Sequence, residues 1–424
     1  MTERGDPTTM HRLGPDGDDG AELIMSVLRR YLLESKDPRW GREFVPDVLG
    51  TVSGTVNFDG QGLAAALALV EDVIVPSCRP NDSPRMLSYV PTAPTLACRE
   101  MDALLGALSI FGSHWEAGAG AIAAENEALR WLSDLAGLPA EAGGCFVSGG
   151  SAANLAALVT ARFAWRSERG SGADEGPLRI AATAEAHASI AAVAHVMGVQ
   201  LVDVRSIDGR MDVNHLRALL EADRRRPSTF AVVTTAGTTS QGLVDGLDPI
   251  ADLCEEFGVW MHVDAAYGGA ALCAPSVRSR FDGIERCDSL TIDPHKWLFA
   301  AYDCAAILYR DPQLAASAHA QRANYLDRIE SEVWNPADYA FHLSRRAGGC
   351  RSGSASSCTA PAPTSGQSRP PWHGPAPSPT QSMRRRTSGS SSRPSSRSSC
   401  SSAKAGTPRI SDGGAPRSPT RESP

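Results

Sequence analysis

The 424-residue sequence has no apolar run that approaches the roughly 18 residues needed to span a bilayer. Residues 1–19 are polar and rich in glycine and aspartate, so they contain no apolar stretch of a secretion signal. The 10 cysteines include no C-x-x-C pair, which favours reduced structural thiols over a disulfide framework or a metal site. With a net charge of -7, these absences predict a cytoplasmic protein that binds no membrane and, along its whole length, no nucleic acid.

Leucine, valine and phenylalanine are missing from residues 347–424, where serine, proline and arginine dominate and 11 Lys/Arg face 2 Asp/Glu. Because this segment can bury little apolar surface, we expect it to be disordered, like the polar residues 1–19. It is an inert tail, a basic arm for RNA, or, as we prefer, the product of a shifted reading frame. Re-reading residues 347–360 from the third base of suitable codons gives a stretch rich in leucine, valine and aromatic residues.

Short apolar runs alternate with Ala- and Leu-rich stretches from about residue 143 onwards. The predicted strands are 145–147, 180–183, 200–204, 229–235, 260–264, 289–292 and 304–309, and predicted helices include 152–165, 215–223 and 248–257. This alternation predicts an α/β domain with a mostly parallel central sheet flanked by helices, in which ligands bind beyond the carboxyl ends of the strands. We expect that domain over residues 111–346, after a helical segment at 20–110 that includes an amphipathic helix at 21–34.

Lys296 stands just past the end of the apolar strand 289–292, between His295 and Trp297. A buried ammonium is costly unless it is paired, so packing alone explains this lysine poorly, although a surface lysine with a buried stem is the alternative. An amine held as a Schiff base explains it well. Asp264 ends the strand 260–264, and a strand-end lysine with a strand-end aspartate is what a pyridoxal 5'-phosphate enzyme requires.

Asp264 and two further side chains have predicted roles around the cofactor ring. Asp264 would keep the ring nitrogen protonated, so that the ring accepts the electrons of a breaking bond at the substrate Cα; its alternative is a turn or capping aspartate. Ala266 lies on the same side of an extended chain and can rest against one ring face. His187, which follows the strand 180–183, can stack on the other face and donate to a substrate carboxylate, although a lone histidine is more often a core or surface residue.

A strand end, two glycines and a helix start follow one another around Ser151. The backbone N–H groups of Gly150, Ser151 and Ala152 are predicted to bind the cofactor phosphate, although capping alone would also explain this pattern. Thr239, after the strand 229–235, offers a hydroxyl to the same phosphate. His295 is expected to add positive charge there.

These motifs together resemble the group II pyridoxal phosphate-dependent amino-acid decarboxylases over roughly residues 20–346. Pro-His-Lys-Trp at 294–297 is similar to the lysine motif of that family, His-Val-Asp-Ala-Ala-Tyr at 262–267 to its ring-nitrogen motif, and Ala-His-Ala-Ser at 186–189 to its histidine motif. The resemblance implies a fold-type I, aspartate aminotransferase-like structure. It also implies a homodimer with active sites near the subunit interface, and conversion of a small-molecule substrate, an L-amino acid, to its amine and CO2.

The resemblance also implies a substrate pocket. Segment 88–92 looks like the pocket of the aromatic members, and segment 111–115 like a loop lent by the partner subunit; the residues concerned are Tyr89, Pro91, Thr92, Phe111 and Ser113. Asp-Ala-Ala-Tyr at 264–267 is closer to the aromatic and diaminobutyrate branches than to the glutamate branch, so an aromatic substrate is slightly favoured.

The sequence departs from the family pattern in two places. Neither Tyr325 nor Tyr339 aligns with the mobile-loop tyrosine that protonates the substrate carbon in the family, so that role stays open. After Arg346 the family continues into a Leu/Trp/Phe-rich helix and a small C-terminal domain, which this chain lacks as written. Another reaction on the same site, such as an aldehyde synthase, lyase or desulfurase, and a catalytically impaired homologue are therefore the alternatives.

Overall fold

The computed structural model describes residues 17–34, 48–57, 60–81, 83, 86, 90, 93–169, 177–319, 321 and 334–349. The chain divides into two units, Met1–Pro377 and Ser378–Pro424, and the second lies wholly outside the described residues. Residues 1–16 and 350–424 also lie outside them, so disorder at both ends and a shifted reading frame stay predictions. No helix within the described ranges is long and apolar enough to cross a membrane.

Helices form the described part of the chain before residue 110. They are α1 (Gly17–Arg29), α2 (Val48–Val52), α3 (Leu63–Leu69), α4 (Val75–Ser77) and α5 (Leu96–Leu108), with π-helical turns at Arg30–Glu34 and Val70–Ile74. The amphipathic helix predicted at 21–34 is thus found, with a π-helical last turn. Thr95 caps α5 by accepting the N–H of Cys98, and its own N–H donates to the carbonyl of Phe299 at 3.1 Å.

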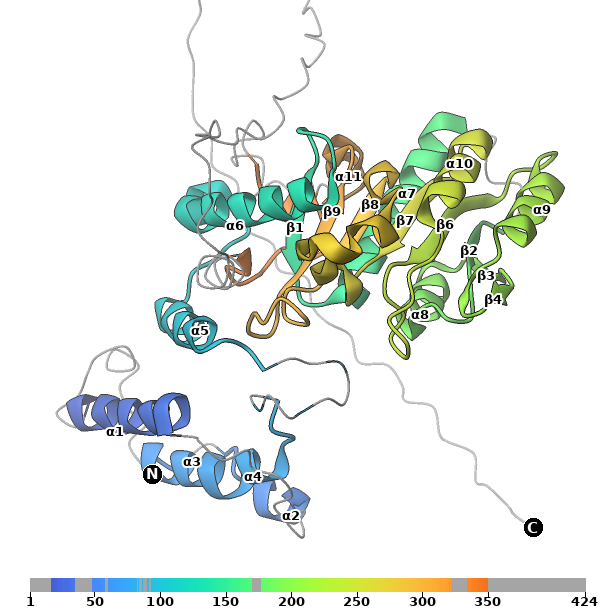
Figure 1. Cartoon of the computed structure of the whole chain (residues 1–424). Coiled ribbons are helices and arrows are strands. Elements are labelled where there is room, and N and C mark those ends of the chain that lie inside the picture. Colours follow the sequence, from blue (N-terminus) through green and yellow to red (C-terminus); the bar gives the residue numbers. More distant parts are fainter. Residues whose placement is uncertain are drawn as a thin grey trace, which may run out of the picture. The chain divides into compact units, whose positions relative to one another are not determined.

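A seven-stranded sheet is the centre of the α/β domain (Figure 1). Its strands are β1 (Gly143–Val147), β2 (Arg179–Ala182), β3 (Gln200–Asp203), β6 (Thr229–Thr235), β7 (Trp260–Asp264), β8 (Ser289–Ile292) and β9 (Ala305–Tyr309), in the order β1-β9-β8-β7-β6-β2-β3. Strand β9 is antiparallel to both of its neighbours, and the remaining strands share one direction. The predicted mostly parallel sheet is therefore confirmed. A separate hairpin joins β4 (Ser206–Ile207) to β5 (Arg210–Met211).

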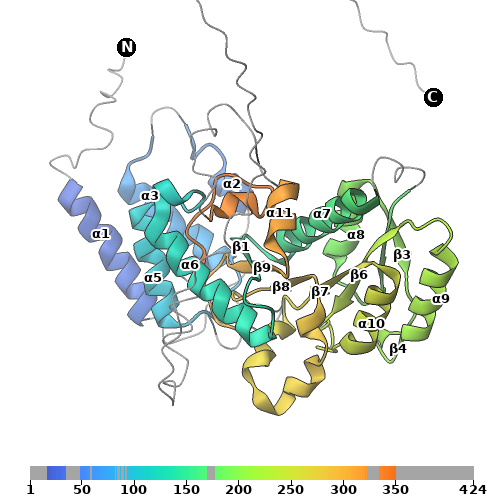
Figure 2. The same cartoon turned by 90° about the horizontal axis from the view of Figure 1, so that it is seen from above.

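Helices cover both faces of the sheet (Figure 2). One face carries α6 (Trp115–Ala136), α9 (Val213–Asp223) and α10 (Leu247–Phe257), and the other carries α7 (Gly150–Arg169), α8 (Ala188–Met197) and α11 (Pro312–His319). Short 3₁₀ helices occupy Gly268–Cys273, Pro275–Phe281, Ile284–Arg286 and Pro336–Asp338. This layered arrangement is the one expected for strands that alternate with helices.

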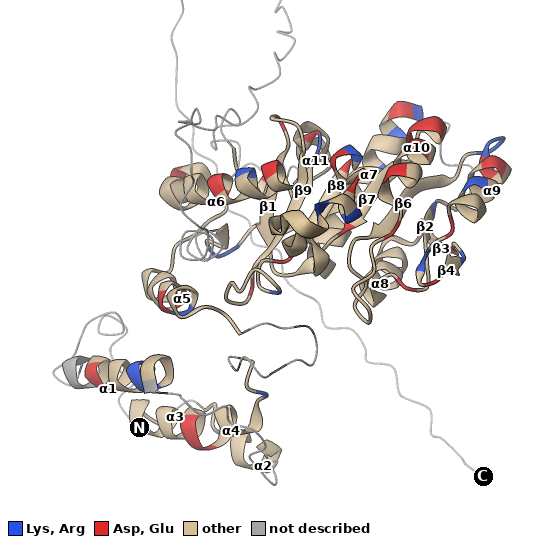
Figure 3. Cartoon of the chain, in the orientation of Figure 1, with Lys and Arg blue, Asp and Glu red and all other residues tan. Residues whose placement is uncertain are grey.

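Side chains along each strand alternate between two apolar cores, one on each face of the sheet. On β9, Ala306 and Leu308 belong to the core under α6, α9 and α10, whereas Ile307 and Tyr309 belong to the core against α7 and α11. Strands β6, β8 and β9 contain no charged residue, and charged residues are frequent on outer helices such as α9 and α10 (Figure 3). Burial on both faces explains why these strands have nearly continuous apolar sequences.

A buried ion pair ties the segment 334–349 to α6. The guanidinium of Arg345 contacts both carboxylate oxygens of Glu125, at 2.7 and 2.6 Å, and only 5% and 1% of these two side chains are exposed. Glu125 also accepts the N–H of Phe146, and Arg345 donates to the carbonyl of Gly112 at 2.6 Å. Beyond the pair, Ala347 is still buried, so packed structure continues past the domain boundary predicted at 346.

We expect Glu125→Ala to lower the free energy of unfolding by about 3 kcal/mol or more, because it leaves a buried guanidinium without its counter-ion. The control is Glu256→Ala, which removes an exposed pair with Arg217 (2.9 Å) and should cost less than about 1 kcal/mol. Urea unfolding followed by circular dichroism measures both. Equal losses in the two variants would contradict the structural role assigned to the buried pair.

Candidate active site

A cavity of about 300 Å³ opens at the sheet edge where β1, β2, β6, β7 and β8 end. All the predicted cofactor-binding residues except Ala152 line it, namely Gly150, Ser151, His187, Thr239, Asp264, Ala266, His295 and Lys296. Because those strands run in the same direction, segments that are far apart in the sequence meet here. The structure therefore brings together the groups that the sequence suggested, at the predicted edge of the sheet.

Lys296 is held at the mouth of the cavity by the turn that follows β8. Its Nζ lies 3.1 Å from Oδ2 of Asp293, and 24% of the lysine side chain is exposed. Asp293 itself is buried, and the same oxygen accepts the N–H of Gly150 at 3.2 Å. Burial raises the pKa of Asp293 to about 6, while the charge of Lys296 opposes this rise. The other oxygen, Oδ1, has no hydrogen-bond partner among the described residues.

Asp264, at the end of β7, is a buried carboxylate that faces the cavity. Its Oδ2 accepts a hydrogen bond from the amide of Asn154 at 2.9 Å, and its Oδ1 accepts the N–H of Ala266 at 3.1 Å. Both donors are uncharged, and no ion pair reaches Asp264 within the described part of the chain. A buried carboxylate without a cationic partner is costly, so this site suits a positively charged ligand group such as a protonated ring nitrogen.

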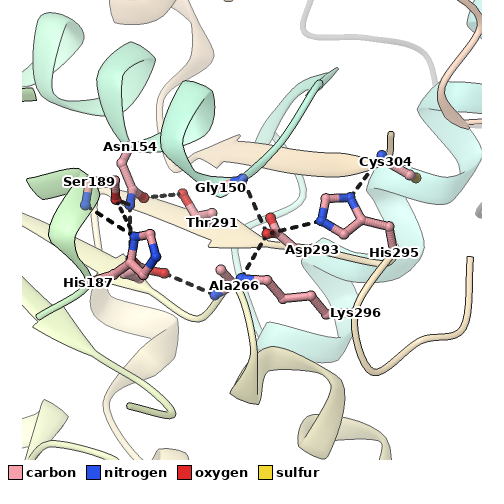
Figure 4. A network of polar contacts seen from close by, with 11 residues as sticks. Gly150, Asn154, His187, Ser189, Ala266, Thr291, Asp293, His295, Lys296 and Cys304 are labelled. Atoms are coloured by element: carbon pink, nitrogen blue, oxygen red, sulfur yellow. Dashed lines mark hydrogen bonds and ion pairs between the residues drawn. The ribbon is translucent and has the colours of Figure 1, made fainter. Parts of the chain in front are cut away.

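A one-way series of hydrogen bonds fixes Asn154, and Figure 4 shows its contact with Thr291. The indole of Trp260 donates to the Ser289 hydroxyl (2.8 Å), which lies 2.8 Å from Nδ1 of His262. His262 Nε2 and the Thr291 hydroxyl then both donate to Oδ1 of Asn154, each at 3.0 Å. Burial lowers the pKa of His262 to about 4, against the influence of Asp264, so the ring is neutral near pH 7. The amide is therefore oriented with its NH2 group toward Asp264.

His187 caps the N-terminus of α8 with its own ring. The N–H of Ser189 donates to Nδ1 at 3.2 Å, and the Ser189 hydroxyl, which accepts from Asn154, lies 2.9 Å from the same nitrogen. Because a backbone N–H can only donate, Nδ1 is an acceptor and the neutral ring carries its proton on Nε2. That Nε2–H is the group that His187 can offer to a ligand.

His295 differs from its predicted role. Its Nδ1 accepts the N–H of Cys304 at 3.0 Å, and its ring lies 4.7 Å from that of Tyr302. Burial, followed by the charge of Lys296, lowers the pKa of His295 to about 4. The ring is thus neutral near pH 7, so it offers an N–H donor to the site and does not add the expected positive charge.

Of the predicted substrate-pocket residues, Phe111 and Ser113 are described, and neither lines this cavity. Ala152 and Phe111 line a neighbouring cavity of about 780 Å³, and Ser113 is fully buried, with its hydroxyl donating to the carbonyl of Leu343. A buried hydroxyl that already has a partner indicates a structural role for Ser113. The other three predicted residues, Tyr89, Pro91 and Thr92, lie outside the described residues.

Only one of the two candidate proton-donor tyrosines is described. Tyr325 falls outside the described residues, and Tyr339 is buried against Trp334, with ring centroids 4.0 Å apart. Tyr339 does not line the cavity, whereas Tyr267, just after β7, and Tyr302, just before β9, both do.

Sequence reasoning missed the groups that orient the predicted ones, namely Asn154, Ser189, His262, Asp293 and Tyr302. Two of them had a usable signal: His262 alternates with Asp264 on β7 and so shares its face, and Asn154 lies one helical turn after Gly150 on α7. Asp293 had none, because an aspartate before a proline is also a common turn residue.

The glycine turn before α7 allows close approach to the site. A Cβ added at Gly150 would lie 3.0 Å from Oδ2 of Asp293 and 3.1 Å from Cβ of Ala266. Only glycine leaves this space open at the start of α7, where the backbone N–H groups favour an anion. With the unbalanced carboxylate of Asp264 and the amine of Lys296, the residues fit the phosphate, ring nitrogen and aldehyde of pyridoxal phosphate.

This fold and this site define a class, the fold-type I pyridoxal phosphate enzymes. Residues 59–351 match the model of the pyridoxal-dependent decarboxylase conserved domain, and the chain belongs to that family. The resemblance noted from the sequence motifs is thereby confirmed.

Similar proteins agree with this assignment. The aromatic-L-amino-acid decarboxylase of Bacillus atrophaeus is 34% identical over 62% of this chain and 56% of its own length, and the L-2,4-diaminobutyrate decarboxylase of Rhizobium meliloti is 35% identical over 68% and 58%. The crystal structure of Oryza sativa TDC with PLP and tryptamine superposes with a TM-score of 0.75 at 25% identity, covering 82% of this chain and 76% of that one. The chain thus spans somewhat over half the length of the curated relatives it matches.

We expect Gly150→Ala to weaken pyridoxal phosphate binding by about tenfold or more, because the added methyl group crowds Asp293 and Ala266. Gly120→Ala is the matched control, since a Cβ at this exposed position of α6 meets nothing within 4 Å. Titration followed by tryptophan fluorescence gives both dissociation constants. Unchanged affinity in Gly150→Ala would show that the cofactor does not approach this turn.

Proposed function

We propose that this chain is a pyridoxal phosphate-dependent decarboxylase that converts an L-amino acid to the amine and CO2. The observation that carries the proposal is the meeting of Lys296, Asp264 and His187 at one cavity. Each side chain offers a different function there: an amine, a buried carboxylate and an N–H donor on an oriented ring. Membership of the decarboxylase family supports this reaction over others that use the same cofactor.

The residues of the cavity would hold the cofactor as follows. Lys296 would bind its aldehyde carbon, Asp264 its ring nitrogen, and Ala266 and His187 would lie against its two faces. The N–H groups at the start of α7, with Thr239, would hold its phosphate. When bound, the cofactor supplies an electron sink for the pair released as a bond at the substrate Cα breaks.

The protein decides which bond breaks. His187 would donate its Nε2–H to the substrate carboxylate and so orient the bond from that group to Cα for cleavage. Asp264 would keep the ring nitrogen of the cofactor protonated, and Asn154 holds Asp264 in place by its 2.9 Å hydrogen bond. Because Asn154 is buried, this orientation does not depend on solvent.

An aromatic substrate is the favoured one. Tyr267 and Tyr302 line the cavity, and Trp297 stacks on Tyr267 with ring centroids 5.2 Å apart and planes within 14°. Such surfaces attract aromatic rings through stacked or edge-to-face contacts. The aromatic-L-amino-acid decarboxylase among the relatives supports the same choice.

We also propose that the protein is a cytoplasmic homodimer. Each copy would consist of a helical segment at 20–110 and an α/β domain at 111–346. The helices before residue 110 expose large apolar side chains, among them Ile24, Met25, Leu63, Leu104 and Leu108. Apolar surface of this extent favours burial against a second copy of the chain.

We expect the purified chain with pyridoxal phosphate to release CO2 and amine from aromatic L-amino acids faster than from acidic or basic ones. Borohydride reduction followed by peptide mass spectrometry should place a pyridoxyl group on Lys296, and Lys296→Ala should lose both the label and CO2 release. The other lysines of the sequence, Lys36 and Lys404, are the internal controls. Label on those two alone, or ammonia, peroxide and aldehyde as products, would contradict the proposal.

A further inference from the structure

Asp293 occupies the anion position of the site. Its Oδ2 lies 3.2 Å from the N–H of Gly150 at the start of the 20-residue helix α7 and 3.1 Å from Nζ of Lys296. Its Oδ1 has no hydrogen-bond partner among the described residues, although only 2% of the residue is exposed. The carboxylate therefore pairs with the lysine and also uses a helix N–H that a bound phosphate would use (Figure 4).

A phosphate at the same helix end would bring a second anion beside this carboxylate. Like charges at such close range in a buried site repel strongly, because little water screens them. The conflict disappears if Asp293 carries a proton, since its unpartnered Oδ1 can then donate to a phosphate oxygen.

We propose that Asp293 is a positioning residue that holds the phosphate position while the cofactor is absent, and that it must take up a proton before the phosphate binds. This inference rests on the proposed cofactor site. It adds to that site a proton-linked step in cofactor loading, which begins with a carboxylate paired to Lys296 and ends with a neutral acid beside the phosphate.

The groups that face Asp293 set the pH range. Burial raises the pKa of Asp293 to about 6, Lys296 lowers it and Asp264 raises it. His295 is neutral in this range, because its pKa is lowered to about 4, and Tyr302 is neutral because burial raises its pKa above the usual value. Below about pH 6 Asp293 is a neutral acid when the ligand binds, and above about pH 6 it is a carboxylate. Affinity for a phosphorylated ligand should therefore fall as the pH rises through 6.

The test uses a probe that cannot bond covalently to Lys296. Pyridoxamine 5'-phosphate has an amine in place of the aldehyde, and pyridoxamine is the same ring without the phosphate. Both are titrated by calorimetry, between about pH 5.5 and 8, into the full-length wild type and the isosteric variant Asp293→Asn. At about pH 8 the variant should bind the phosphorylated probe at least about tenfold more tightly than the wild type, and at about pH 5.5 nearly equally. Pyridoxamine should show no such difference.

Asp288→Asn is the matched control. Asp288 is also mostly buried, at the opposite end of β8, where it accepts the N–H of Met261 at 2.7 Å and burial raises its pKa to about 6. Because it lines a different cavity, its substitution should leave both probes unaffected.

Equal binding by wild type and Asp293→Asn at every pH, or the same difference with pyridoxamine, would overturn the inference. If Asp293→Asn does not fold, Asp293→Ser takes its place, because the phosphate of the probe itself loses a proton at about pH 6 and only a variant at position 293 separates the two titrations. Pyridoxyl labelling of Lys296 without this pH-dependent difference rejects only the role of Asp293. Failure of both probes to bind, with no labelling, rejects the cofactor site as well.

Discussion

The side-chain amide of Asn154 is the contact on which the site depends. It is buried on α7 and joins that helix to three other elements, through Asp264 at the end of β7, Thr291 on β8 and Ser189 on α8. All of these partners are buried as well, so any lost hydrogen bond would leave a polar group unsatisfied in a low-dielectric interior. The position of the cavity carboxylate and the orientation of His187 therefore follow from a single side chain.

The charged side chains of the cavity do not fully balance one another, and a ligand of complementary charge would balance them. Among the described residues, Asp264 accepts hydrogen bonds from uncharged donors alone, whereas Asp293 is paired with Lys296. The nearby histidines at 262 and 295 are held neutral by burial, so neither balances a carboxylate. A molecule with a cationic ring nitrogen, an aldehyde and an anionic phosphate supplies what each of these groups lacks, which is why the residues fit pyridoxal phosphate as a set.

The buried pair of Glu125 and Arg345 holds the last described segment against α6. It explains why packed structure continues to Ala347, although the composition of the sequence changes abruptly there. Composition reports whether a segment can form a core of its own. It does not report whether a few residues are held by a neighbouring core, and here one ion pair and its backbone contacts do so.

By itself, the sequence determined the strands and their mostly parallel arrangement, because these follow from local periodicity. It also pointed to Lys296, Asp264 and the glycine turn before α7, because each is placed at the end of a strand. The tertiary structure alone decided what orients them. Asn154, Ser189 and Asp293 act through contacts between residues that are distant in the sequence, and such contacts leave no local pattern. The neutrality of His295 and the burial of Ser113 are likewise products of folding, since burial, and not residue type, sets the charge of an imidazole and the availability of a hydroxyl.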